Sequence, residues 1–135
     1  MIPVVIDASA GVELVVDTVR GRALRGLLPI DAVPWAPDIF YVEVGTVLRR
    51  WDLSSVLTPA QVGKAVHQLS TWPLRIGRLR PLFATAWRYR HNITFADATY
   101  VALAEHLGAQ LLTDNHRLAN APALPVPVLR LGIQP

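Results

Sequence analysis

The sequence predicts an α/β fold in which helices cover both faces of a central, mostly parallel sheet. Short runs of apolar, largely β-branched residues, such as Val4-Val5-Ile6, have the length of buried strands. Between these runs lie longer segments in which apolar residues recur at helical spacing. Strands and helices alternate along the whole chain, which is the pattern of a three-layer α/β/α domain.

Length and composition limit the possible classes of protein. The 135 residues fit a single domain, residues 1–135, and 52% of them are hydrophobic, which argues against disorder. No stretch approaches the roughly 18 uncharged apolar residues of a membrane span, and the start of the chain lacks the basic segment of a signal peptide. There is no cysteine, which excludes disulfides and thiolate metal sites. We therefore expect a cytoplasmic protein with no membrane partner.

The charge balance favours an anionic partner without requiring one. The net charge is +3, and 12 of the 13 basic residues are arginine, which binds phosphate in a forked geometry that lysine cannot match. A basic surface attracts nucleic acid or an acidic protein. Ordinary solubility explains a charge of this size equally well.

The first third of the chain predicts a strand, two helices and a loop. The run Val4–Ile6 predicts a buried strand, and Ser9 is placed to cap the helix that follows and ends near residue 16. A second helix is expected from about Thr18 to Leu28, with arginines on its polar side. Three prolines interrupt Pro29–Pro37, which predicts a loop with at most a short strand near Val33.

The middle third predicts two helices, a strand and a further helix. An apolar stripe at helical spacing predicts a helix over residues 38–51. Thr58 followed by Pro59 is typical of a helix start, with a capping hydroxyl and proline at the first helical position. Alternating apolar and basic residues predict a half-exposed strand over Leu74–Leu79, and a helix is expected over Leu82–Tyr89.

The last third predicts a long helix, a buried strand and two short elements. Apolar residues at helical spacing predict a helix that ends at Leu107, where Gly108 is typical of a C′ glycine. The run Gln110–Thr113 has the length of a strand. A short helix or turn is expected over His116–Ala121, and an edge strand among prolines over Val126–Leu131.

Four of the ten acidic residues fall at strand ends or near helix starts on one inferred edge of the sheet. They are Asp7, Glu43, Asp97 and Asp114. Ligands of such sheets bind beyond the carboxyl ends of the strands. Two carboxylates about 5 Å apart repel by ~3 kcal/mol at an effective dielectric constant of about 20, so a cluster would require a cation. Mg²⁺ takes oxygen ligands, keeps several waters and can supply a nucleophile.

Each of these acids also has an ordinary structural explanation. Asp7 would serve as a helix N-cap, and Asp97 would form a capping box with the threonine three residues before it. Asp114 would act as a cap or turn residue. Glu43 borders an apolar stripe, where a carboxylate is costly unless Arg50 or Arg49 pairs with it.

Arginines and aromatic residues gather between residues 75 and 91. Arginine interleaved with aromatic rings suits single-stranded or looped RNA, because bases stack and phosphates need charge. The alternative is a solvated face over core aromatics. The candidate RNA-binding residues are Arg75, Arg78, Arg80, Arg88 and Arg90. No histidine has ligand spacing, and no serine, histidine and acid form a recognisable triad.

Four segments together resemble a known family. They are Val4-Val5-Ile6-Asp7-Ala8-Ser9, Glu43-Val44-Gly45-Thr46-Val47-Leu48-Arg49, Phe95-Ala96-Asp97-Ala98-Thr99-Tyr100-Val101-Ala102-Leu103-Ala104 and Leu111-Leu112-Thr113-Asp114-Asn115-His116-Arg117-Leu118. In this order the chain resembles a PIN domain, specifically the VapC-type toxins of bacterial toxin–antitoxin pairs. The resemblance covers nearly the whole chain.

The resemblance implies a PIN-like three-layer domain and a Mg²⁺- or Mn²⁺-dependent endoribonuclease. Such toxins inhibit translation by cutting RNA, often tRNA or rRNA. A cognate VapB-like antitoxin blocks the site, and homodimers are usual. By carry-over, Asp7, Glu43 and Asp97 are the acidic site residues and the metal ligands, and Asp114 is the candidate for the fourth catalytic acid.

The fourth acid departs from the family pattern of threonine, any residue, aspartate. Here Thr113 is followed by Asp114 and then by Asn115. Either Asp114 reaches the pocket from the neighbouring place, or Asn115 contributes a neutral oxygen; side chains alternate along a strand, so both cannot point the same way if the strand continues. Ser9 and Thr113 are candidates for orienting a water.

Two rival functions and one assembly follow from the same residues. The asparagine at the fourth position is the best support for the alternative of a catalytically weak or inactive PIN-like module that binds RNA or protein. A phosphoacceptor receiver domain is disfavoured because the only lysine, Lys64, lies inside a predicted helix. A homodimer is expected to form through the helices at 38–51 and 58–72.

Overall fold

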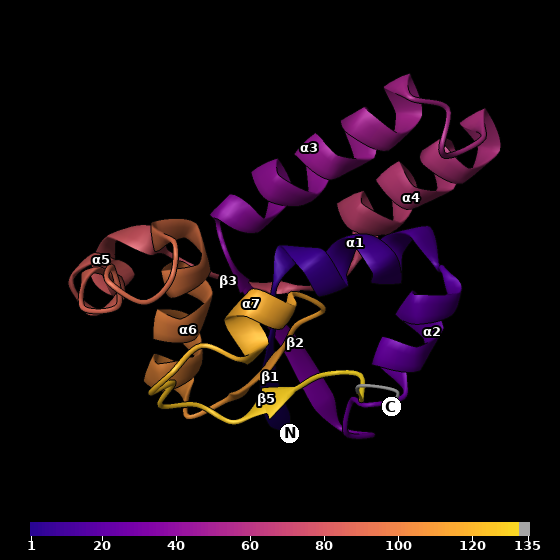
Figure 1. Cartoon of the computed structure of the whole chain (residues 1–135). Helices are drawn as coiled ribbons and strands as arrows, with labels where there is room; N and C mark the ends of the chain where they lie inside the picture. Colours follow the sequence, from indigo (N-terminus) through magenta and orange to yellow (C-terminus); the bar gives the residue numbers. More distant parts are fainter. Residues whose placement is uncertain (133–135) are drawn as a thin grey trace.

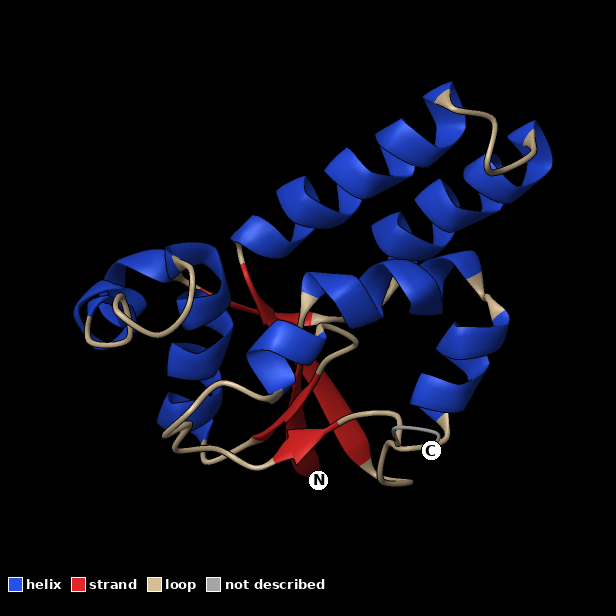
Figure 2. Cartoon of the chain, in the orientation of Figure 1, coloured by secondary structure: helices blue, strands red, loops and turns tan. Residues whose placement is uncertain are grey.

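The computed structural model describes residues 1–132 and contains a five-stranded sheet in which every strand pair is parallel. The strand order is β3-β2-β1-β4-β5. The strands are β1 (Ile2–Ile6), β2 (Ala32–Pro37), β3 (Arg75–Gly77), β4 (Gln110–Leu112) and β5 (Val128–Leu129). The predicted parallel α/β sheet is therefore confirmed (Figure 2).

Helices cover both faces of this sheet (Figure 1). They are α1 (Ala8–Val16), α2 (Val19–Arg25), α3 (Ile39–Leu53), α4 (Pro59–Thr71), α5 (Leu79–Trp87), α6 (Phe95–Leu107) and α7 (His116–Ala119). α6 packs on β1, β2 and β4 with α5 beside it, and α1 and α2 lie on the other side. α3 and α4 form a hairpin that packs on α1 at its base and projects from the body. Within residues 1–132, no helix has both the length and the apolarity needed to cross a membrane.

The central strand β1 explains the apolar run at the start of the chain. It lies between β2 and β4, with Val5 opposite Trp35 and Ile6 opposite Leu112. Val4, Val5 and Ile6 are fully buried. A strand covered on both faces needs a continuous apolar run. The carboxyl end of β1 thus places residue 7 at the middle of one sheet edge.

The second strand is longer than the sequence predicts. Pro29–Pro37 was expected to be mostly loop, but β2 extends over Ala32–Pro37. Proline is excluded from interior strands because it lacks an N–H group. However, β3 begins opposite Trp35, so β2 has only β1 as a partner at Pro34. β2 is an edge strand at that point, which explains why it tolerates the proline.

Helix boundaries follow capping chemistry, with two corrections. Ser9 was predicted to cap α1, but the N-cap is Asp7, whose side chain accepts a hydrogen bond from the backbone of Ala10. α5 begins at Leu79 rather than at residue 82, because proline is tolerated in a first helical turn. Gly108 ends α6 at φ +61, as predicted.

Candidate active site

A pocket of about 390 Å³ lies at the sheet edge where β1 ends. Three of the four predicted acids line it, and they come from three separate parts of the chain: the end of β1, the first half of α3 and the first turn of α6. The polar residues of the lining are Asp7, Ser9, Glu43, Thr46, Asp97, Tyr100 and Asn115. The fold thus brings together most of the carboxylates that the sequence selected.

Asp7 is the most buried acid of the pocket, with an exposed fraction of 3%. Its Oδ1 atom accepts hydrogen bonds from the Ala10 backbone N–H at 3.0 Å and from the Ser9 hydroxyl at 2.7 Å. Its Oδ2 atom accepts one from the Thr113 hydroxyl at 2.6 Å. Burial raises the pKa of Asp7 to about 6, although these hydrogen bonds oppose the shift. Asp7 is therefore both a helix cap and a buried carboxylate whose charged form is disfavoured.

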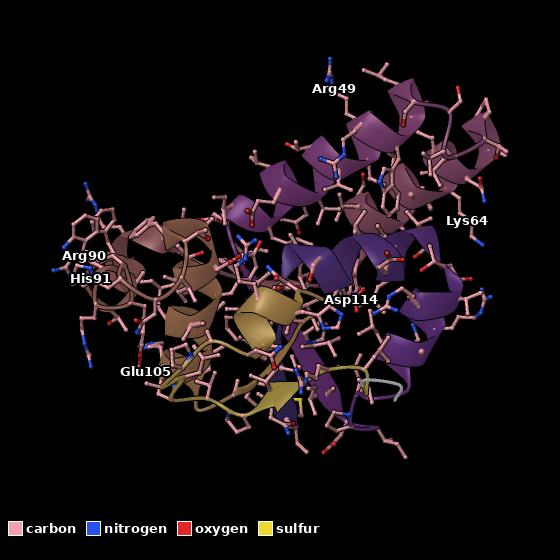
Figure 3. All side chains as sticks on the ribbon, viewed as in Figure 1. Arg49, Lys64, Arg90, His91, Glu105 and Asp114 are labelled. Carbon is pink, nitrogen blue, oxygen red and sulfur yellow. The ribbon has the colours of Figure 1, made fainter. Side chains whose placement is uncertain are left out.

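Glu43 reaches the pocket from α3 and is held by a tyrosine rather than by an arginine. Its Oε1 atom accepts a hydrogen bond from the Tyr100 hydroxyl at 2.6 Å. Arg49 lies on the outer side of α3 (Figure 3), and Glu43 has no ion-pair partner in the described part of the chain. Burial raises the pKa of Glu43, and the nearby charge of Asp97 adds to the shift.

Asp97 stands in the first turn of α6. Its backbone N–H donates to the Thr94 hydroxyl at 3.1 Å, which is one half of the expected capping box. Over residues 1–132 the reciprocal bond of the box is not formed, so the Asp97 carboxylate is available to the pocket. Burial raises the pKa of Asp97, and the Thr94 side chain and the positive charge of Arg117 partly offset that rise.

Asp114 and Asn115 follow the end of β4 at Leu112, and their side chains point to different places. Arg20 donates two hydrogen bonds to the Asp114 carboxylate, one of them from Nε at 2.9 Å, so that Asp114 faces α2 (Figure 3). Asn115 lines the pocket, and its Oδ1 atom caps α7 by accepting from the backbone of Arg117 and Leu118. The structure thus brings Asn115 to the pocket and does not bring Asp114 there.

The two hydroxyls expected to support the pocket act on the carboxylate of Asp7. Thr113 is fully buried and donates to Asp7. Ser9 lines the pocket, donates to Asp7, and accepts a hydrogen bond from the backbone of Asp114 at 2.9 Å. Together they tie the end of β4 to the start of α1, which fixes the position of Asp7.

The five arginines selected as RNA-binding candidates do not form one surface. Arg75 stacks over Trp35 in a hollow near the amino end of β1, opposite the edge that carries Asp7. Arg78 lines a hollow beside the last turns of α6, and Arg80 is exposed in the first turn of α5. Arg88 and Arg90 follow α5, and Arg90 lies over the exposed ring of Trp87, which contacts Phe95 at the start of α6. Of the five arginines, only Arg88 and Arg90 lie in the connection between α5 and α6, which leads to Asp97.

Two residues of the site were missed in the sequence. Tyr100 lines the pocket and binds Glu43, and Arg117 lies close enough to Asp97 to affect its pKa. The position of Tyr100, one helical turn after Asp97, was a usable signal, because residues three apart lie on the same helix face. Arg117 carried no such signal, because its place depends on how α7 folds back over the sheet edge.

The donors of the pocket suit a hard divalent cation that keeps part of its water shell. Among residues 1–132, no three histidine or acidic side chains stand close enough to hold one ion jointly. Mg²⁺ commonly binds through one or two carboxylates and retains several waters, so such a shared cluster is not required. Three carboxylates whose pKa values are raised by burial, with no basic side chain in the pocket lining, form an environment that a cation would relieve.

Comparisons with known proteins agree with this geometry. The family model of the PIN domain matches residues 4–124. Ribonuclease VapC1 of Mycobacterium tuberculosis is 42% identical over 130 residues, which cover 90% of this chain and 92% of the relative. The crystal structure of VapC20 of Mycobacterium tuberculosis, described as a sarcin-ricin loop cleaving toxin, superposes with a TM-score of 0.61 at 21% identity and covers 85% of this chain and 92% of its own.

A second solved structure extends the similarity in fold over almost the whole chain. VapBC2 from Rickettsia felis, bound to a DNA fragment from its promoter, gives a TM-score of 0.66 at 13% identity and covers 96% of this chain and 98% of the other. At such identities the two superpositions establish the fold. With the family match and the 42% identity to VapC1, they show that the chain belongs to the PIN-domain family and is a relative of the VapC ribonucleases.

Proposed function

We propose that this protein is a divalent-metal-dependent endoribonuclease toxin of the VapC type, which hydrolyses RNA phosphodiester bonds and is neutralised by a VapB-like antitoxin. The observation that carries the proposal is the convergence of Asp7, Glu43 and Asp97 on one pocket. The sequence similarity to VapC1, which is named a ribonuclease, supports the same activity. A toxin that inhibits translation by cutting tRNA or rRNA acts in the cytoplasm.

The surroundings of the acids support a proposed role for each of them. Asp7 and Asp97 would hold Mg²⁺, or Mn²⁺ in its place, and Glu43 would contact the ion through water or accept a proton from the attacking water. When bound, the cation would polarise a phosphoryl oxygen and lower the pKa of a bound water. Ser9 and Thr113 orient the Asp7 carboxylate, and Asn115 offers the pocket a neutral donor or acceptor group.

Asp114 has a different proposed role in this arrangement. Its bidentate bond to Arg20 joins the loop after β4 to α2. Because Asn115 is the next residue, the bond between Arg20 and Asp114 also restricts the orientation of Asn115 towards the pocket. We assign Asp114 to the support of the site, and a substitution of this residue tests that assignment below.

RNA would enter past the start of α6. Trp87 is 51% exposed and Phe83 is 55% exposed, and their rings stack with an interplanar angle of 13°. Arg88 and Arg90 place positive charge beside these rings. Exposed aromatic faces with arginine suit unpaired bases and their phosphates. Arg75 and Arg78, beside Trp35 and the end of α6, are less well placed for that role.

The proposed partners are a VapB-like antitoxin and a second copy of the chain. The solved VapBC2 complex gives a precedent on the same fold. The hairpin of α3 and α4 carries exposed apolar side chains, Val42, Leu53, Val56 and Val66, which suit a homodimer interface. A light-scattering mass equal to one chain would contradict the dimer.

The alternative function is a PIN-like module that binds RNA or protein with little or no cleavage. Its support is Asn115, which lines the pocket where the family pattern has aspartate. The two functions differ in a measurable property. A binding module would retain RNA affinity but would bind Mg²⁺ poorly in calorimetry.

The deciding experiment is cleavage of total bacterial RNA by the purified protein freed of antitoxin, with Mg²⁺ and with EDTA. The test variants are Asp7→Asn and Asp97→Asn. The matched control is Asp52→Asn, which removes an exposed carboxylate of α3 outside the pocket. Discrete fragments that require Mg²⁺, Asp7 and Asp97 but not Asp52 would support the nuclease. Cleavage that persists in Asp97→Asn would refute the assignment of the site.

A further inference from the structure

Tyr100 joins two helices that carry acids of the pocket. It lies one turn after Asp97 in α6, and its hydroxyl donates a hydrogen bond to the Oε1 atom of Glu43 in α3 at 2.6 Å. The residue is 1% exposed, and it is one of the residues that line the pocket. The phenol therefore connects a fixed position in the core to a carboxylate that must be placed accurately.

Glu43 depends on this one contact for its orientation. A glutamate has several rotatable bonds, and a half-buried one adopts a single position only if something fixes it. Within residues 1–132, Tyr100 is the sole hydrogen-bond donor to the Glu43 side chain. The tyrosine ring has two side-chain torsions and is enclosed by the core, so its hydroxyl is a rigid reference point.

Core packing does not account for the hydroxyl. A phenylalanine would fill almost the same apolar volume, and a buried hydroxyl costs free energy unless it is hydrogen-bonded. Burial raises the pKa of Tyr100 well above its usual value, and the bond to Glu43 raises it further, so the phenol stays protonated and acts as a donor. The carboxylate of Glu43 is its partner, which leaves the other oxygen of that carboxylate for the pocket.

We propose that Tyr100 is a positioning residue of the active site, whose hydroxyl holds one oxygen of Glu43 so that the second oxygen is presented to the attacking water or its cation. This inference deepens the proposed nuclease function and rests on it for its catalytic consequence. Tyr100 itself touches neither substrate nor cation in this scheme. It acts through Glu43 alone.

The molecule contains a matched control for this bond. The Tyr89 hydroxyl donates to the Oε2 atom of Glu105 at the same distance of 2.6 Å, outside the lining of the pocket. Tyr89→Phe and Tyr100→Phe therefore remove the same chemical group from the same kind of partner. A difference between them in turnover measures the effect of position in the site.

The test is steady-state cleavage of a cleavable RNA at saturating Mg²⁺, with the two variants compared with the wild-type protein. Removing a group that orients a functional ligand typically costs about 10–100-fold in activity. We expect this loss in kcat for Tyr100→Phe, with KM changed by less than about twofold, and an unchanged kcat for Tyr89→Phe. An unchanged kcat in Tyr100→Phe would overturn the proposal, as would equal losses in both variants.

Two further measurements separate this proposal from the nuclease proposal. In a Glu43→Gln background, Tyr100→Phe should reduce kcat no further, because residues that act as a unit are not additive. A crystal structure of Tyr100→Phe without metal should show Glu43 in more than one rotamer, and a single unchanged rotamer would overturn the positioning role. If the wild-type protein cut no RNA, the nuclease proposal would fail, and the rotamer of Glu43 would still decide the role of Tyr100.

Discussion

Replacing the buried Asp7 by asparagine should stabilise the protein at neutral pH while removing its activity. Burial raises the pKa of Asp7 from 3.8 to about 6 in the folded state. The folded state therefore binds the Asp7 proton more tightly than the unfolded state. The stability that comes from the neutral carboxyl is present below about pH 4 and is lost as pH rises towards 6. At ~1.4 kcal/mol per pKa unit, the charged form costs the folded state ~3 kcal/mol at pH 7.

Asparagine can keep the hydrogen bonds of this position without the charge. Its oxygen can accept from Ala10 and Ser9, as Oδ1 does now. Its amide can donate to the Thr113 hydroxyl, which is able to accept as well as donate. We therefore expect Asp7→Asn to raise the free energy of unfolding by roughly 1–3 kcal/mol at pH 7, or the melting temperature by several degrees.

The assay is urea unfolding of both proteins in EDTA at pH 7 and at pH 4, so that no cation offsets the carboxylate charge. The gain should largely disappear at pH 4, where Asp7 is protonated in the folded wild-type protein. Mg²⁺ should then stabilise the wild-type protein and leave Asp7→Asn unchanged, because a cation that binds only the folded state adds to its stability. Lower stability of Asp7→Asn at pH 7, or an equal gain at both pH values, would refute the reasoning.

Four other substitutions test the packing and the fourth acid position. Gly21→Ala should destabilise the fold by about 1–3 kcal/mol in thermal unfolding, because the added Cβ atom would lie 2.1 Å from a backbone carbonyl oxygen of α1. Gly63→Ala should instead stabilise α4 by about 0.5–1 kcal/mol, because a Cβ atom added there has no neighbour within 4 Å and alanine favours the helix. Asn115→Asp should tighten Mg²⁺ binding roughly tenfold in calorimetry, since it adds a carboxylate to the pocket, and unchanged affinity would show that the side chain does not reach the ion. Asp114→Asn should keep RNA cleavage within a few-fold of the wild-type rate. It should lose at most about 1 kcal/mol of stability, because Arg20 is half-exposed and an ion pair in that setting contributes little. Loss of cleavage would make Asp114 the fourth catalytic acid.

The order of elements could be predicted from the sequence because local patterns determine them. Buried strands such as β1 are continuous apolar runs, and threonines at helix starts cap α2, α4 and α6 through their side chains. The extent of β2 could not be predicted in this way. Pro34 is tolerated only because β3 is too short to reach it, and that depends on a pairing with residues 40 positions further along the chain.

The same division holds for the site. Asp7, Glu43 and Asp97 could be selected because each follows a strand end or lies near a helix start, and the topology then gathers them. Asp114 and Asn115 could not be distinguished, because their directions depend on the bond from Arg20, a residue 94 positions away in the sequence. Local patterns identify the residues available at a sheet edge, whereas distant contacts decide which of them face the pocket.

The central place of β1 bears on when the protein can act during its own synthesis. β1 is made first, but its partner β4 and the Thr113 hydroxyl that holds Asp7 come more than 100 residues later. A nascent chain on the ribosome therefore cannot complete the pocket until nearly all of the domain has emerged from the exit tunnel. At about 5–20 residues per second, this gives a delay of roughly 5–20 seconds between the synthesis of β1 and the first competent site. An antitoxin that recognises the finished pocket has no target before that moment.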